Sequence, residues 1–155
     1  MITLHKLPGK FEEGAYGVVF FNEHGYAIKV FKRRADAPEE HLDNVFKSEV
    51  EAYTIANKHQ ELHTLVPDFF GSIQCTQVLD AAGNDISHDF HLSLAYKMKK
   101  VEGEFIKLGI KDAKLRAIFN EAGIGHTIDA SVLLDGESVK CVVDIATQEH
   151  ELWHQ

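Results

Sequence analysis

The sequence predicts an α+β fold with a five-stranded antiparallel sheet and one long helix, followed by a shorter helix and a β-hairpin. Three observations lead to this prediction. Short apolar runs separated by turn residues mark strands in residues 11–31, 66–79 and 90–98. Apolar residues recur at three and four positions between 36 and 58, as in an amphipathic helix. Near the end, Asp135-Gly136 separates two further apolar runs, as a hairpin turn does.

Composition limits the function classes. The chain has 155 residues, 45% of them hydrophobic, which suffices for one domain, 1–155. Within it we expect residues 1–100 to form the sheet and the long helix, and residues 101–155 to form a reduced second part. Sixteen basic and 24 acidic residues give a net charge of −8, which argues against nucleic acid and anionic membranes as partners. No stretch approaches the roughly 18 apolar residues of a membrane-spanning helix, so we expect a cytoplasmic protein. For a phage or secreted effector protein, that cytoplasm would be the host's.

The two cysteines suggest no redox or metal chemistry. Cys75 and Cys141 lie in separate apolar runs without C-x-x-C spacing. We expect two buried, reduced thiols.

The first strands carry the main candidate site. Residues 11–21 read as two strands joined by the turn Gly14-Ala15-Tyr16-Gly17, and a second turn at residues 22–25 leads to the strand at residues 26–31. Glycines let a phosphate approach backbone N–H groups, and Lys29 on the third strand supplies a fixed positive charge. The period of two places Lys29 on one face with Ala27, whose small side chain leaves room for a flat group. The stretch therefore predicts a polyphosphate site.

The long helix adds a carboxylate. We expect Asp36 as its N-cap, Pro38 in its first turn, Glu39 completing a capping box, and an end near residue 58. Glu49 falls inside the apolar stripe, where a charge is costly unless a cation meets it. Lys29 is the strand lysine expected to point inward, so we predict a Lys29–Glu49 pair. The alternative is that Glu49 only borders the stripe and faces water.

The remaining elements follow in order. A fourth strand runs from Val66 through Leu79 to a turn at residues 80–85, and a fifth covers 90–98. A helix from about Lys111 to Glu121 stops at Gly123. The hairpin at residues 131–144 then places Ser131 and Asp144 at its two free ends.

These motifs resemble those of protein kinases. E-E-G-A-Y-G-V-V at 12–19 is similar to the kinase G-x-G-x-x-G-x-V, with Glu12 in place of the first glycine, and Y-A-I-K at 26–29 is similar to V-A-I-K. V-K-C-V-V-D-I-A at 139–146 resembles the strand leading into D-F-G. G-I-G-H-T-I-D-A-S at 123–131 resembles the kinase catalytic loop with two residues missing. The family's base position then falls on Ile128, with Asp129 one residue late, and Ser131 replaces the catalytic-loop asparagine.

The resemblance implies roles for these residues. It implies a kinase-like N-lobe of five strands and helix C, a vestigial C-lobe of one helix and a hairpin, and ATP with Mg²⁺ or Mn²⁺ as cofactor. Ala95 to Met98 would be the hinge that binds adenine. Four residues would be catalytic: Lys29, Glu49, Asp129 and Asp144. The nucleotide would contact Gly14, Ala15, Tyr16, Gly17, Val19, Ala27 and Lys29, and Asp144 and Ser131 would hold the metal.

Two function classes stay open. Only eleven residues follow Asp144, so we expect no activation segment or substrate platform, a reduction beyond that of truncated bacterial effector kinases. This favours a pseudokinase-type binding or regulatory protein with a protein partner. The alternative is an active ATP-dependent Ser/Thr protein kinase, or a small-molecule phosphotransferase, using Lys29, Glu49 and Asp144.

One further motif has a metal-binding pattern. Residues 150–154, H-E-L-W-H, match the H-E-x-x-H of zinc proteases. Such enzymes need a third ligand, normally downstream, and the sequence stops at Gln155. We expect a C-terminal helix end there, with Trp153 on the core.

Overall fold

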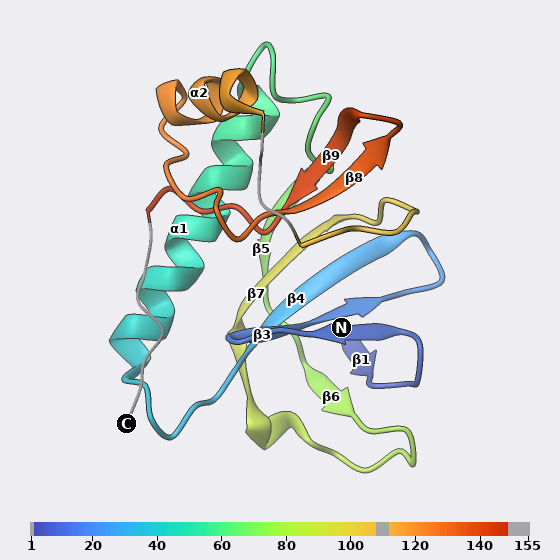
Figure 1. Ribbon diagram of the computed structural model, residues 1–155. Coiled ribbons are helices and arrows are strands. Elements are labelled where there is room, and N and C mark those ends of the chain that lie inside the picture. Colours follow the sequence, from blue (N-terminus) through green and yellow to red (C-terminus); the bar gives the residue numbers. More distant parts are fainter. Residues whose placement is uncertain (1, 108–111, 149–155) are drawn as a thin grey trace. The chain divides into compact units, whose positions relative to one another are not determined.

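The computed structural model describes residues 2–107 and 112–148 (Figure 1). They divide into two compact units: the first contains residues 2–46 and 70–100, and the second contains residues 47–69, 101–107 and 112–148. Within the described residues, no helix is long and apolar enough to cross a membrane.

The first unit contains most of a five-stranded antiparallel sheet, which confirms the predicted sheet. Its order is β2-β3-β4-β7-β5. The strands are β2 (Phe11–Glu13), β3 (Gly17–Phe21), β4 (Tyr26–Lys32), β7 (Phe90–Lys99) and β5 (Phe69–Ile73). The two turns fall where the glycines predicted them, so β2, β3 and β4 form a meander.

A pair of parallel strands was not predicted. β1 (Thr3–His5) pairs with β6 (Gln77–Leu79), so the single strand expected over residues 66–79 is wrong. The chain leaves the main sheet after Cys75, whose N–H still bonds to the carbonyl of Leu92, and the next N–H, that of Thr76, bonds to Ile2. The chain then turns at Asp80–Asp85 and passes through the short 3₁₀ helix η1 (Ser87–Asp89) into β7.

One hydrophobic cluster of the first unit lies on one face of the sheet. Alternate residues of β3 and β4 contribute to it, together with β1, β6 and β7. Its buried members are Leu4, Val18, Phe20, Ile28, Val30, Cys75, Val78, Phe90 and Ala95. Burial of this apolar surface is the main favourable term in the folding of the unit.

Helix α1 (Glu39–Lys58) ends where predicted but begins three residues after the predicted cap, Asp36. That prediction is wrong because the Asp36 carboxylate accepts two hydrogen bonds from the Arg34 guanidinium, at 3.1 and 2.8 Å. The first helical carbonyl acceptor is that of Pro38, which bonds to the N–H of Leu42. The predicted apolar stripe is buried at Leu42, Val45, Phe46, Tyr53 and Ala56, while Val50 is half-buried.

The second unit contains α2 (Ala113–Glu121) and the hairpin of β8 (Ser131–Asp135) and β9 (Ser138–Val143), as predicted (Figure 1). Asp112 caps α2 by accepting hydrogen bonds from two N–H groups of its first turn. Gly136 has a φ of +65°, which closes the hairpin turn. The largest fully buried side chains of this unit are Tyr53, Leu62, Phe119, Ile124, Val142 and Ile145.

Candidate functional site

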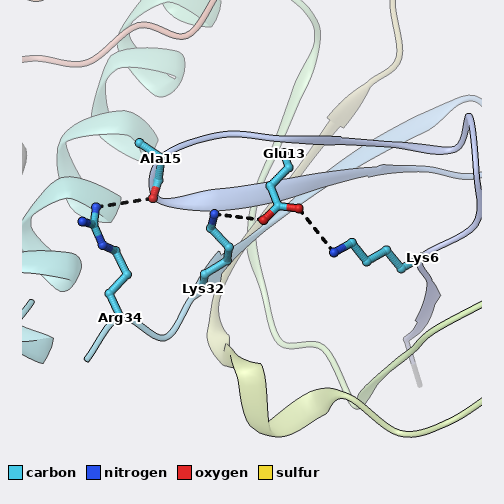
Figure 2. A network of polar contacts seen from close by, with 5 residues as sticks. All are labelled: Lys6, Glu13, Ala15, Lys32 and Arg34. Carbon is cyan, nitrogen blue, oxygen red and sulfur yellow. Dashed lines mark hydrogen bonds and ion pairs between the residues drawn. The ribbon is translucent and has the colours of Figure 1, made fainter. Parts of the chain in front are cut away.

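The glycine turn in the first unit is a tight hairpin connection anchored to the end of β4. The Gly14 N–H donates to the Gly17 carbonyl at 2.8 Å, and the Lys32 N–H donates to the Tyr16 carbonyl at 2.8 Å. Arg34 Nη1 donates to the Ala15 carbonyl at 3.4 Å (Figure 2). Three carbonyls of the turn are thus satisfied within the unit.

Basic residues around the turn are paired with carboxylates. Figure 2 shows the Glu13 carboxylate between Lys32 and Lys6, with N–O distances of 3.1 and 3.3 Å. Chiefly through the hydrogen bond from Lys32, these ammonium groups lower the pKa of Glu13. Arg33 pairs with Glu39, and Arg34 with Asp36. The run Lys32-Arg33-Arg34 is therefore neutralised locally and is no concentrated anion-binding patch.

Tyr16 holds the tip of the turn. Its ring stacks on Phe31 with centroids 6.4 Å apart, and its hydroxyl lies 3.1 Å from Nε2 of His41 on α1. The Arg34 guanidinium lies over the same ring at 5.4 Å. The side chain of Tyr16 is thus engaged by the protein itself, and a phosphate would contact this residue through its backbone.

Lys29 lies directly beside the glycine turn. A Cβ on Gly17 would lie 3.1 Å from Lys29 Cε and 2.8 Å from the Val30 carbonyl oxygen, so only glycine lets the lysine stem pass at this distance. The Lys29 ammonium is 5.2 Å from the Phe31 ring centroid and 6.0 Å from that of Tyr96. The side chain is half-buried between strand neighbours.

Strand register places four of the predicted nucleotide contacts on one face: Gly17, Val19, Ala27 and Lys29. Val19 pairs with Lys29 across β3 and β4, Gly17 pairs with Phe31, and Ala27 pairs with Phe21. Directly opposed residues share a face of the sheet. Glu12 is opposite Val19, so its carboxylate lies on the Lys29 face, where it would weaken anion binding.

Glu49 is buried, as its place in the apolar stripe predicted, with 9% of its surface exposed, whereas Glu51 is exposed. It lies one helical turn before Tyr53 on α1, and its charge contributes to the raised pKa of the Tyr53 hydroxyl. The expectation that Glu49 faces water is wrong. Lys29 belongs to the first unit and Glu49 to the second, and their pairing stays a prediction.

In the second unit, Asp144 forms the centre of a polar cluster. Asp144 follows β9 with a φ of +64°, the one left-handed non-glycine residue within the described ranges. Its Oδ2 accepts hydrogen bonds from Ser131 Oγ at 2.8 Å and Lys107 Nζ at 3.2 Å. Its N–H donates to the Tyr53 hydroxyl oxygen at 3.0 Å. The hairpin thus brings Ser131 and Asp144 together, as the sequence predicted.

Sequence reasoning missed two members of this cluster. Tyr53 was expected only as an apolar residue of the stripe, because the pattern reports burial and not the direction of a hydroxyl. Lys107 is separated from Asp144 by 37 positions and has no motif around it. The only sequence signal for Tyr53 was that the hydroxyl of a buried tyrosine usually has a hydrogen-bond partner.

The oxygen atoms of Asp144 and Ser131 suit Mg²⁺ or Mn²⁺, which prefer oxygen ligands. One carboxylate and one hydroxyl fit an ion that is also held by substrate phosphates and water, and they do not form a complete protein cage. Within the described residues, no group of three or more His, Cys, Asp or Glu side chains could hold a metal ion. The Lys107 side chain is 64% exposed, so it can move away from the carboxylate when a cation binds.

The predicted base, Asp129, lies in a surface turn. Its side chain is 71% exposed and pairs with Nε2 of His126 at 3.3 Å. His126 itself is fixed by two backbone hydrogen bonds with Ala146, at 3.0 and 3.2 Å. The family's base position holds Ile128, which is 73% exposed.

The structure tests the predicted adenine-binding hinge but not the H-E-x-x-H motif. Ala95 to Met98 lie inside β7 and pair with residues 27–30 of β4, so this stretch is sheet and not a hinge with exposed backbone groups. The hinge assignment is therefore wrong for these residues. The H-E-x-x-H motif at 150–154 lies outside the described residues.

Both cysteines are buried and reduced, as predicted. Burial raises the pKa of each thiol to about 11, which keeps them unreactive near neutral pH.

Comparisons with known proteins returned no match among protein-family models, curated proteins or solved structures.

Proposed function

We propose that this chain is a minimal kinase-like protein that binds ATP with Mg²⁺ or Mn²⁺ and acts as a pseudokinase-type binding or regulatory protein with a protein partner. One observation carries the proposal: the Lys29 stem packs against Gly17, so a fixed cation stands at a glycine turn. Turns of this kind accept phosphates because backbone N–H groups can approach them closely.

Each residue of the proposal has one role. Lys29 would bind phosphate oxygens, and Ala15 to Gly17 would offer backbone N–H groups, because the Gly14 N–H is bonded within the turn. Asp144 and Ser131 would hold the metal ion, which when bound neutralises charge on the phosphates. The cation–π contacts of Lys29 with Phe31 and Tyr96 hold its stem in place.

Two observations argue against phosphoryl transfer. The Asp129 carboxylate is exposed and paired with His126. The general base of the kinase pattern is therefore not held in position by the hairpin that carries Asp144. Glu12 lies on the Lys29 face of the sheet, where it lowers affinity for the phosphates and so favours a protein-binding role. Phosphoryl transfer requires reacting groups held in exact positions, and neither feature meets that requirement.

The alternative is an active phosphotransferase that uses Lys29, Glu49 and Asp144. The left-handed backbone of Asp144 favours it, because such strain persists where surrounding structure supports it and is concentrated at functional sites. In this case Asp129 would have to leave His126 and accept the proton of the substrate hydroxyl.

Nucleotide binding is tested by thermal unfolding with ATP and Mn²⁺, ATP alone, and Mn²⁺ alone. ATP–Mn²⁺ at 100 times its Kd should stabilise the chain by about 2.7 kcal/mol, and Lys29→Met should remove most of this effect. Lys97→Met is the matched control, because Lys97 pairs with Ile28 on the opposite face of the same sheet. An unchanged melt of the wild-type chain at millimolar nucleotide refutes the proposal.

Phosphoryl transfer is measured separately with γ-labelled ATP and generic protein substrates. We expect no transfer above a Lys29→Met background. Label incorporation that disappears in Asp144→Ala would establish the phosphotransferase instead. Pull-down with wild-type chain as bait should recover a stoichiometric protein partner.

A further inference from the structure

The hydroxyl of Tyr53 reaches the backbone of Asp144 from the interior of the second unit. Tyr53 is 2% exposed, and its oxygen accepts the Asp144 N–H at 3.0 Å across 91 positions of sequence. A buried tyrosine hydroxyl normally has a polar partner. Here the partner is the amide of the only non-glycine residue with positive φ in the described ranges.

The ring that carries this hydroxyl is fixed on several sides. It stacks on Phe69 with centroids 5.3 Å apart and planes at 15°. The Phe69 N–H donates to Asn57 Oδ1 at 3.0 Å, and Asn57 Nδ2 in turn donates to the carbonyls of Tyr53 and Pro67, at 2.9 and 3.2 Å. Contacts within α1 and with the start of β5 therefore help to position the hydroxyl.

The Asp144 backbone needs such support. A left-handed conformation brings Cβ close to the following carbonyl oxygen, which is unfavourable for residues other than glycine, although Asn and Asp adopt it more readily than the rest. The conformation places Asp144 Oδ2 against Ser131 Oγ at 2.8 Å. If the backbone relaxed, the carboxylate would leave the hydroxyl that is its proposed co-ligand.

We propose that Tyr53 is a positioning residue that holds Asp144 in its left-handed conformation and thereby sets the affinity of the Asp144–Ser131 pair for a divalent cation. This inference rests on the proposed function, since it concerns the metal ion of the same ATP site. Tyr53 touches neither nucleotide nor metal in this scheme and acts through Asp144. Burial and the charges of Asp144 and Glu49 raise the pKa of Tyr53 well above its usual value, so the hydroxyl stays neutral at working pH.

The test is Tyr53→Phe, which keeps the ring and its stacking on Phe69 and removes only the oxygen. The probe is Mn²⁺, titrated at fixed ATP while thermal stabilisation is followed. We expect the Mn²⁺ concentration for half-maximal stabilisation to rise by about threefold to tenfold, corresponding to one lost hydrogen bond. Stabilisation by ATP without metal should not change, which separates positioning of the cation ligand from a general structural defect.

Thr54→Val is the matched control. It removes a hydroxyl from the next residue of α1, where Thr54 Oγ1 donates to the Val50 carbonyl at 2.7 Å. This variant should keep the wild-type Mn²⁺ dependence. A second readout is amide hydrogen exchange at Asp144, which should speed up in Tyr53→Phe and stay slow in Thr54→Val.

The outcomes separate the two proposals. If wild-type chain shows Mn²⁺-dependent stabilisation and Tyr53→Phe retains it unchanged, the role of Tyr53 is refuted and the ATP site stands. Unchanged exchange at the Asp144 amide in Tyr53→Phe refutes the positioning contact whatever the nucleotide result. If wild-type chain binds ATP with no Mn²⁺ dependence, the metal role of Asp144 fails and the inference fails with it.

Discussion

Replacing Gly17 by alanine gives the sharpest test of the glycine turn. The new Cβ would lie 2.8 Å from the Val30 carbonyl oxygen, in a central strand, and 3.1 and 3.4 Å from Cε and Cγ of Lys29. The lysine can shift, but the Val30 carbonyl belongs to the sheet and moves only with β4. Gly17→Ala should therefore displace both the strand pairing and the Lys29 side chain.

The size of the effect follows from two opposing contributions. Inserting a group into a well-packed site costs about 1–3 kcal/mol. Removing a glycine from the unfolded chain favours folding by about 0.4–1 kcal/mol. The net loss is about 1–2 kcal/mol, which for a chain of this length lowers Tm by roughly 2–8 °C.

The assay is thermal and urea unfolding followed by circular dichroism, with Gly14→Ala as control. A Cβ on Gly14 would meet nothing closer than the Gly17 carbonyl oxygen at 3.7 Å, an ordinary contact. Gly14→Ala should therefore be neutral or slightly stabilising. Equal stability of Gly17→Ala and wild type, or equal losses in the two variants, would show that the close approach of Lys29 and Val30 does not require glycine.

Three further predictions concern stability. Asp112→Ala should cost about 1 kcal/mol by removing the α2 cap, while Asp112→Asn should be nearly neutral in urea unfolding; equal losses in both would contradict capping. Phe119→Ala should cost about 3–5 kcal/mol because the ring is fully buried, and a loss below that of Asp112→Ala would contradict its place in the core. The pKa values of Cys75 and Cys141 are raised from 9.0 to about 11 in the folded chain, so their contribution to stability is complete below pH 9 and is lost as pH rises through 11. Urea unfolding at several alkaline pH values should show this decline, and the double alanine variant should show a shallower one.

Much of the fold was predictable because local signals agree with it. Glycines mark turns that only they adopt easily, and the period of two is clearest where alternate residues of β3 and β4 enter one hydrophobic cluster. The helix stripe likewise predicted the burial of Glu49. The cap at Asp36 failed because a guanidinium two residues earlier competes for its carboxylate, and helix boundaries depend on such contacts.

Part of the candidate site was also predictable from the sequence, and part was not. The sequence identified Gly17 and Lys29 at the glycine turn, and Ser131 and Asp144 at the hairpin ends. Strand periodicity and turn chemistry determine the relative positions of residues that are close in sequence. The hinge assignment for Ala95 to Met98 failed because a motif comparison does not report which backbone groups a neighbouring strand uses.

By itself, the amino-acid sequence determined the five-stranded sheet, the long helix, the hairpin and the chemical types at the glycine turn. Only the tertiary structure decided that β1 and β6 pair, that Glu12 shares the Lys29 face, and that Asp129 pairs with His126. It also decided that Tyr53 supports Asp144. The physical reason is that periodicity and turn propensity act between near neighbours, whereas register, ion pairing and a hydroxyl acceptor 91 positions away depend on how the whole chain packs.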